Sequence, residues 1–246
     1  PPHWAPPEVT LEHYASLLGA VSHYKGMVVQ SLWPVFRLAA WNSIVAAVVT
    51  TVVVVVLSAM AGYAFARFNF PGKNLLFGVV VATMALPAYA VMIPLYRIMI
   101  STHLLDTHVG LVLIYTSAFA PLALWLMRGY YSAVPVSLEE AAMIDGCSRF
   151  EALVRIVLPS AIPGVVAVAL LTFLSVWSQF LIPLVFAPTN STRPLTVLLT
   201  EFVTKYSINY GLMTAAGILT MLPPILLVLF LNRYIVSGLT AGAVKG

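Results

Sequence analysis

Charged side chains gather in one short stretch of an otherwise apolar chain, residues 137–163. The stretch holds four carboxylates and two guanidinium groups, on Glu139, Glu140, Asp145, Glu151, Arg149 and Arg155. Placing even one such charge at the centre of a bilayer costs about 2.5–3.5 kcal/mol. The stretch therefore cannot cross a membrane, and the chemistry that it offers is recognition. We expect it to lie at a membrane surface and to present a folded polar face to a soluble partner.

The order of residues predicts that this stretch folds as helix, tight turn, helix. Ser137 followed three residues later by Glu140 has the form of a capping box. Glu139 and Glu140 then fall in the first helical turn, where the helix dipole favours negative charge. Gly146 is expected to stop the first helix in a left-handed conformation, and a second helix is expected from about Ser148.

The types and spacing of seven residues resemble the EAA loop of ABC importer permeases: Glu140, Ala141, Ala142, Asp145, Gly146, Pro159 and Pro163. Cys147 stands where the family usually has Ala, and Leu153 stands where Phe is common. The resemblance implies that the loop enters a groove on a cytoplasmic ATPase subunit, so that nucleotide-driven closure moves the membrane helices. The residues that it assigns to ATPase coupling are Glu139, Glu140, Ala141, Ala142, Asp145, Gly146, Arg149 and Phe150. The alternative is an ordinary surface helix between two spans. Its acidic side chains would then only cap the helix and keep its surface hydrated.

The overall composition is that of a polytopic membrane protein. Hydrophobic residues make up 61% of the 246 residues and charged residues 8%, whereas soluble domains carry about 25% charged residues. The net charge of +4 is scattered without a basic run, which argues against nucleic acid as a partner. The five histidines lack the close i, i+4 pairing of a helical zinc site, so no metal site is expected.

The sequence carries no catalytic motif. It lacks a glycine-rich loop ending in Gly-Lys-Ser or Gly-Lys-Thr, a Gly-x-Ser-x-Gly nucleophile elbow and a His-Glu-x-x-His helix. It also lacks the paired intramembrane carboxylates that proton-coupled carriers use. We therefore expect no enzymatic activity and no cofactor bound by this chain. The resemblance assigns ATP and Mg to partner ATPase subunits.

Five runs without Asp, Glu, Lys or Arg are long enough to position the charged stretch between membrane spans: Leu38–Ala66, Asn74–Tyr96, Thr107–Met127, Ile156–Thr192 and Tyr206–Asn232. Each reaches the roughly 20 residues that a spanning helix needs, and a lone strand in lipid would leave its backbone unpaired. The fourth run is too long for one span, so residues 187–192 are assigned to the next loop. The predicted fold is an all-α, polytopic membrane protein with five transmembrane helices and a coupling helix between the third and fourth.

This pattern divides the chain into an extracytoplasmic N-terminal loop, residues 1–36, and a transmembrane permease domain, residues 37–246, with the coupling loop at 132–158. The resemblance implies six spans, with a further helix before the N-terminal loop; either the sequence begins after that helix, which we expect, or the protein has five spans. Seven basic residues fall on the coupling-loop side of the membrane and five on the other. By the positive-inside rule, the coupling loop and the C-terminus are expected in the cytoplasm.

Polar, aromatic and helix-breaking residues within the runs mark a candidate substrate pathway: Met84, Tyr89, Tyr115, Trp177, Ser178 and Gln179. An aromatic ring beside an amide suits sugar recognition, because the ring packs on CH groups and the amide bonds hydroxyls. The competing interpretation, favoured for any single residue, is that these side chains hold the helices together.

The turn at residues 66–73 and the C-terminal sequence SGLTAGAVKG resemble the maltose-type, carbohydrate group of ABC permeases. That resemblance implies an inner-membrane subunit that works by alternating access with a second permease, two ATPase subunits and an extracytoplasmic solute-binding protein. Its substrate is left open among maltodextrins, trehalose, amino sugars and glycerol phosphates. The rival hypotheses are an ATP-independent carrier or channel and a membrane scaffold for an unrelated cytoplasmic protein.

Overall fold

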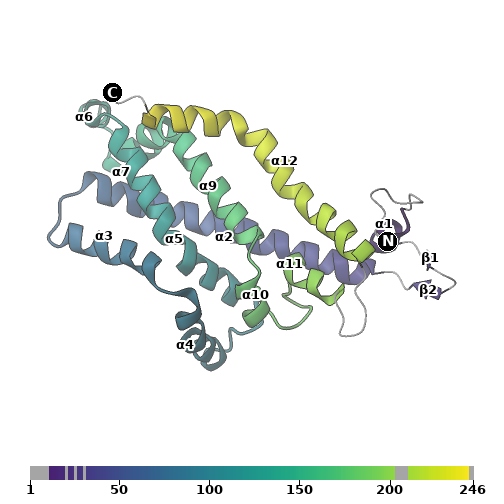
Figure 1. The fold of residues 1–246 in the computed structure, drawn as a ribbon. Helices are drawn as coiled ribbons and strands as arrows, with labels where there is room; N and C mark the ends of the chain where they lie inside the picture. The colour runs from purple at the N-terminus through teal and green to yellow at the C-terminus, as the bar shows by residue number, and fades with distance from the viewer. Residues whose placement is uncertain (1–10, 20–21, 25–26, 30–31, 203–209, 244–246) are drawn as a thin grey trace.

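The structure is a computed structural model that describes residues 11–19, 22–24, 27–29, 32–202 and 210–243. Long helices cross one another along most of its length (Figure 1). In chain order, the elements are α1 (Glu12–Leu17), β1 (Ser22–Tyr24), β2 (Met27–Val29), α2 (Trp33–Arg67), α3 (Lys73–Ala82), the 3-10 turn η1 (Thr83–Ala85), α4 (Ala88–Ser101), α5 (His108–Ala133), α6 (Val136–Ile144), α7 (Arg149–Ala152), the π-helical turn η2 (Leu153–Val157), α8 (Leu158–Ser160), α9 (Ile162–Trp177), α10 (Leu181–Phe186), α11 (Leu195–Leu198), the 3-10 turn η3 (Leu199–Phe202) and α12 (Tyr210–Ala243).

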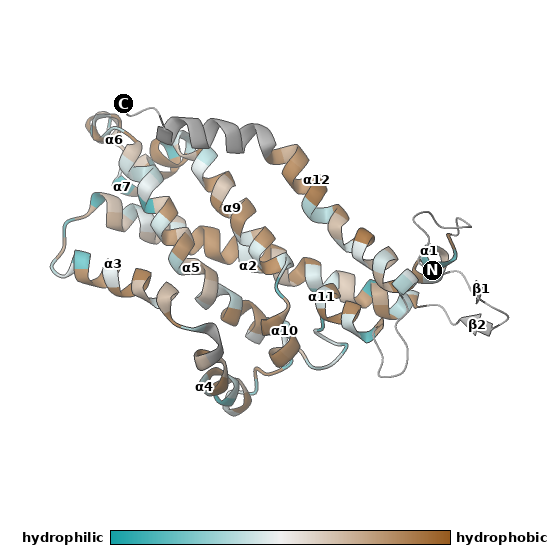
Figure 2. Ribbon diagram, in the orientation of Figure 1, coloured by the Kyte–Doolittle hydropathy of each residue, from teal (hydrophilic) through white to brown (hydrophobic). Residues whose placement is uncertain are grey.

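Three described helices are long and apolar enough to cross a membrane alone: α2, α5 and residues 210–231 of α12. Two further pairs pass the same test together but are bent, residues 73–85 with 90–101 by 101° and residues 149–160 with 162–177 by 77°. Counting each bent pair as one span gives the five predicted spans. Apolar residues run along α2, α9 and the coloured part of α12 (Figure 2), as expected of helices that face lipid or another membrane subunit.

Two of the predicted runs are not single straight helices. The second run is interrupted at Leu86 and Pro87, whose backbones are extended, and α4 begins directly after them. Pro87 disfavours helical geometry at the residue before it, which explains the break. The fourth run stops at Trp177, and a separate short helix, α10, follows from Leu181.

The predicted N-terminal loop also has structure of its own. It contains α1 and a small antiparallel hairpin, in which Ser22 pairs with Val29 and Tyr24 with Met27. The first long helix begins at Trp33, before the predicted boundary at residue 37, with a proline in its first turn. Proline is well tolerated there because the first helical N–H groups have no partner within the helix.

The core consists of two clusters of buried apolar side chains along α2. One lies toward α1, α10 and α11 and includes Leu17, Phe36, Tyr115, Trp177 and Phe186. The other lies toward α6 and includes Val54, Tyr63, Met127, Tyr131 and Val157.

Small residues allow the helices to approach closely. A Cβ atom on Gly62 of α2 would lie 2.9 Å from the Met127 Cβ atom on α5. A Cβ atom on Gly164 of α9 would overlap the ring of Tyr130. Close backbone contact at small residues is how membrane helices gain packing energy where lipid removes the hydrophobic drive.

Candidate functional site

The charged stretch forms a compact loop, here called the coupling loop, from α6 to α8 at one end of the molecule (Figure 1). Its first helix ends as predicted. Gly146 has a left-handed backbone, with φ +92°. The N–H of Gly146 donates to the Met143 carbonyl at 3.1 Å, and that of Cys147 donates to the Ala142 carbonyl at 3.0 Å. These two bonds form a Schellman motif, which satisfies carbonyls at the helix end.

The predicted capping box is wrong in its position. Helix α6 begins at Val136 directly after Pro135 and has no side-chain cap, so Ser137 lies inside its first turn. The capping box forms instead at α7, where the Ser148 N–H donates to Glu151 at 2.9 Å and the Glu151 N–H donates to the Ser148 hydroxyl at 3.3 Å. The pKa of Glu151 is lowered by the Ser148 N–H first, then by the Ser148 hydroxyl and Arg155.

Glu139 points into the protein, and its side chain ties α6 to the end of α2. Glu139 is only 2% exposed. The Arg67 Nε atom lies 2.9 Å from one carboxylate oxygen, and the Tyr63 hydroxyl donates to the other. Arg67 also donates to the Val134 carbonyl at 2.8 Å, so the same guanidinium holds the chain just before α6. We call Glu139, Arg67 and Tyr63 the α2–α6 tie.

Sequence reasoning placed Glu139 among the residues that face a partner, and the structure places it inside the chain instead. It also missed Arg67 and Tyr63, which lie 72 and 76 residues away. Arg67 is one of the seven basic residues counted on the coupling-loop side of the membrane, and it lies in the turn at residues 66–73. Its one local signal was a cation at the end of a long apolar run, which does not identify its acidic partner.

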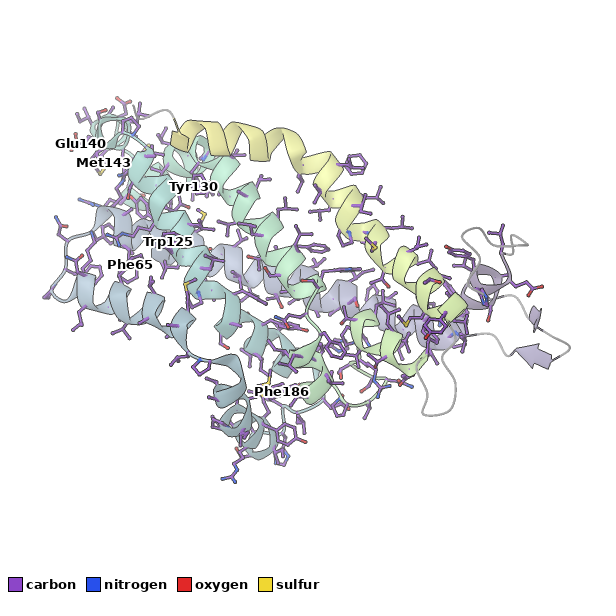
Figure 3. All side chains as sticks on the ribbon, in the orientation of Figure 1. Phe65, Trp125, Tyr130, Glu140, Met143 and Phe186 are labelled. Carbon is purple, nitrogen blue, oxygen red and sulfur yellow. The ribbon has the colours of Figure 1, made fainter. Side chains whose placement is uncertain are left out.

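The other predicted coupling residues form the outer surface of the loop. Exposed among them are Glu140, Ala141, Asp145, Gly146, Arg149 and Phe150, whereas Ala142 is buried beneath them. Glu140 and Met143 lie at the tip of the molecule (Figure 3). Two large apolar side chains also project here, Ile144 at 86% exposure and Phe150 at 68%. Apolar residues among charges on a surface loop are typical of an interaction site, and Ile144 was not among the predicted residues.

The predicted pathway residues do not form one site. Tyr115 and Trp177 are buried in the core cluster nearer α1. The Trp177 indole donates to the Thr220 carbonyl at 3.1 Å, which joins α9 to α12. The Ser178 hydroxyl bonds its own helix, and the Gln179 carbonyl accepts from Thr196 at 2.7 Å. These contacts match the interpretation that they hold helices together.

Among the pathway residues whose side chains are described, Met84 lines a large cavity. The cavity has a volume of about 670 Å³ and lies among α2, α3, η1, α4, α5 and α10. Its wall is mostly apolar, with hydroxyl groups from Ser58, Thr83 and Ser117. The side chain of Tyr89 lies outside the described residues.

At the opposite end, a polar network holds the loop between α10 and α11. The Asn42 amide donates to the Asn190 carbonyl at 3.1 Å and to the Arg193 carbonyl at 3.0 Å, and its oxygen faces His108 at 3.0 Å. Asp106 accepts hydrogen bonds from Thr189, Ser191 and Thr192. Burial raises the pKa of Asp106, but these hydrogen bonds outweigh it and hold the pKa below its ordinary value.

Residues 55–241 match the family described as the inner membrane component of binding-protein-dependent transport systems. This chain belongs to that family. The matched region contains the whole coupling loop together with Tyr63 and Arg67 of the α2–α6 tie.

Relatives extend the match over almost the full chain. A probable ABC transporter permease protein of Pyrococcus horikoshii is 35% identical over 99% of this chain and 84% of its own. The diacetylchitobiose uptake permease DasC of Streptomyces coelicolor is 33% identical over 100% of this chain and 84% of its own. The arabinooligosaccharides permease AraQ of Halalkalibacterium halodurans is 35% identical over 87% of this chain and 75% of its own.

The fold is shared with a solved transporter. The structure superposes on a chain of a bacterial ABC transporter that imports the acidic polysaccharide alginate, with a TM-score of 0.77 and 22% identity. The match covers 94% of this chain and 81% of that one. As a member of the family matched above, the permease is a multi-pass component of the inner membrane that works with ATPase and binding-protein partners.

Proposed function

We propose that this permease imports a carbohydrate, an oligosaccharide or disaccharide, by alternating access driven by partner ATPase subunits. The proposal is supported by relatives named for arabinooligosaccharides, diacetylchitobiose and trehalose. The coupling loop receives the ATPase, and the ATPase subunits hold ATP and Mg. In this arrangement the coupling loop and the C-terminus face the cytoplasm.

The α2–α6 tie is the observation that carries the coupling mechanism. Helix α6 has two faces: one is anchored through buried Glu139, and the other presents Glu140 and Ile144 to the outside. An ATPase that binds the outer face therefore moves α6 without loosening it from α2. Packed helices and ion pairs with fixed geometry are the elements that transmit a displacement through a protein.

The movement has a direct path into the membrane. Arg67 ends a single 35-residue helix whose buried side chains contribute to both core clusters. A displacement of its end thus reaches the walls of the 670 Å³ cavity, to which α2 contributes Leu57, Ser58 and Ala61. The second permease, which completes the central cavity, and the solute-binding protein on the opposite side complete the proposed transporter.

The test is to reconstitute the permease with its sister permease, ATPase and binding protein. Stimulation of ATP hydrolysis by sugar-loaded binding protein is measured for Glu140→Ala and Gly146→Asp, with Ser132→Ala as an exposed control outside the loop helices. We expect both loop variants to insert normally and to lose stimulation, whereas the control keeps it. Parent-like behaviour of both variants would show that the loop is only a surface connection.

Substrate class is tested in the same vesicles. Uptake of labelled arabinooligosaccharide, diacetylchitobiose and trehalose is compared with and without ATP. We expect ATP-dependent uptake of at least one of these sugars. Uptake that persists without the ATPase would support the carrier hypothesis instead, and a complete absence of solute flux would support the scaffold.

A further inference from the structure

A second polar site lies beside the coupling loop, at the turn between α2 and α3. It is a cavity of about 380 Å³ whose wall includes Asn69, Lys73, Asn74 and Arg128. Lys73 comes from the start of α3, whereas Arg128 comes from the last third of α5. Two positive charges from separate helices therefore face one concave space.

These two cations have no acidic partner in the portion of the chain that the structure describes. The ion pairs found there belong to other cations: Arg67 with Glu139, Arg155 with Glu151, and Arg193 with Glu201. Lys73 and Arg128 are both only partly exposed. Withdrawing a charge from water without pairing it is costly, so the site favours an anion from outside the chain.

Arg128 is held in position by aromatic rings. Its guanidinium carbon lies 4.0 Å from the centre of the Phe77 ring, at the distance of a cation–π contact. Phe77 in turn packs against Phe65 of α2, with ring centres 5.4 Å apart. Lys73 donates to the Phe68 carbonyl at 2.8 Å, which uses one of its three N–H groups and leaves two for a ligand.

The surroundings of the cavity indicate what kind of anion it takes. Helix α3 begins at Lys73 and has no buried residue along its length. Leu75 is 74% exposed, and Leu76 and Val79 are also exposed on the same helix. An anion at Lys73 and Arg128 would thus sit where a polar turn meets a bare apolar helix.

We propose that this cavity binds the headgroup phosphate of an anionic phospholipid, with the acyl chains lying along α3. Lys73 supplies a point charge, and the guanidinium of Arg128 supplies a planar donor pair for phosphate oxygens. Basic pockets between membrane helices on the cytoplasmic side are suited to such headgroups. The assignment to the cytoplasmic leaflet rests on the orientation in the proposed function, but the binding chemistry does not.

The experiment reconstitutes the complete transporter into bilayers of phosphatidylcholine mixed with phosphatidylglycerol. The phosphatidylglycerol retained after detergent extraction is then measured by mass spectrometry. We expect Lys73→Gln and Arg128→Gln each to lower retention about fivefold, the effect of one charge near a membrane surface. Arg155→Gln is the matched control, because it removes an exposed cation from the coupling loop, and it should retain the lipid like the parent.

Further arms separate the lipid from other occupants. Arg128→Lys should restore most of the retention lost in Arg128→Gln, which a merely unfolded variant would not do. Parent protein should lose phosphatidylglycerol as salt increases, so the proposal is testable even with a poorly inserting variant. A further arm measures the thermal stability of the parent in pure phosphatidylcholine with added inorganic phosphate. If phosphate raises that stability as much as phosphatidylglycerol does, the lipid assignment is overturned. Unchanged retention in both variants would also overturn it and would leave this surface to a protein subunit.

This outcome is independent of the coupling mechanism. A variant that loses the lipid and keeps stimulated ATP hydrolysis supports the lipid site and leaves the proposed function intact. Conversely, if Glu140→Ala loses stimulated ATP hydrolysis and keeps normal lipid retention, the coupling mechanism is shown to be separate from the lipid site.

Discussion

Replacing Glu139 by Ala should destabilise the permease much more than replacing its neighbour Glu140. The Arg67 and Glu139 side chains are only 7% and 3% exposed, and the Nε–Oε2 distance is 2.9 Å. Removing one member of a buried pair leaves an uncompensated charge and costs about 3–5 kcal/mol. Glu140→Ala removes an exposed carboxylate, for which about 0.5 kcal/mol or less is expected.

The assay is thermal unfolding of the purified complex, followed by fluorescence, together with ATP hydrolysis stimulated by the binding protein. Glu139→Ala should lower stability, and Glu140→Ala should lower stimulation while stability is kept. The double variant Arg67→Met with Glu139→Met should regain most of the lost stability, because apolar replacement of a buried pair is often neutral. Equal stability of Glu139→Ala and Glu140→Ala would refute the tie as a structural anchor.

Three further predictions concern other positions. Gly62→Val should destabilise the α2–α5 contact by about 1–3 kcal/mol, the usual cost of overpacking, because its Cβ would meet Met127 at 2.9 Å; an unchanged unfolding temperature would contradict this. Gly146→Ala should cost about 1–2 kcal/mol for a left-handed backbone at φ +92°, and equal stability would show that the turn rearranges freely. Asp106→Asn should loosen the loop at residues 189–192 and increase its hydrogen exchange. Since the pKa of Asp106 is lowered in the folded state, its stabilisation is complete above about pH 4 and is lost as the pH falls further; protection factors in this loop that do not fall on acidification would refute it.

Local features of the coupling loop were predictable because their causes lie within a few residues. Gly146 needs only its own lack of a Cβ atom to end α6. The two Ser-x-x-Glu patterns show the limit of this reasoning. Ser137 and Ser148 have the same local pattern, but α6 starts after Pro135, so only Ser148 becomes a cap.

Features that depend on distant residues were not predictable. Both Glu139 and Glu140 read as first-turn acids, and only the position of Arg67 at the end of α2 distinguishes the buried one from the exposed one. The number of apolar runs, in contrast, was predictable from hydropathy, because the cost of removing a segment from water depends on its composition. Hydropathy did not give the end of α9 at Trp177, whose indole donates to the Thr220 carbonyl of α12. The break at Pro87 is different, because its cause is local to the proline.

The length of α2 makes the permease sensitive to membrane thickness. A helix of 35 residues is about 50 Å long at 1.5 Å per residue, whereas the hydrocarbon core is about 30 Å thick. The excess must be taken up by tilt or by protrusion into the headgroups. Because Arg67 at the end of α2 holds α6, the tilt of this helix sets how far the coupling loop stands above the membrane surface. A thicker bilayer would draw the loop toward the headgroups, and a thinner one would extend it into the aqueous phase.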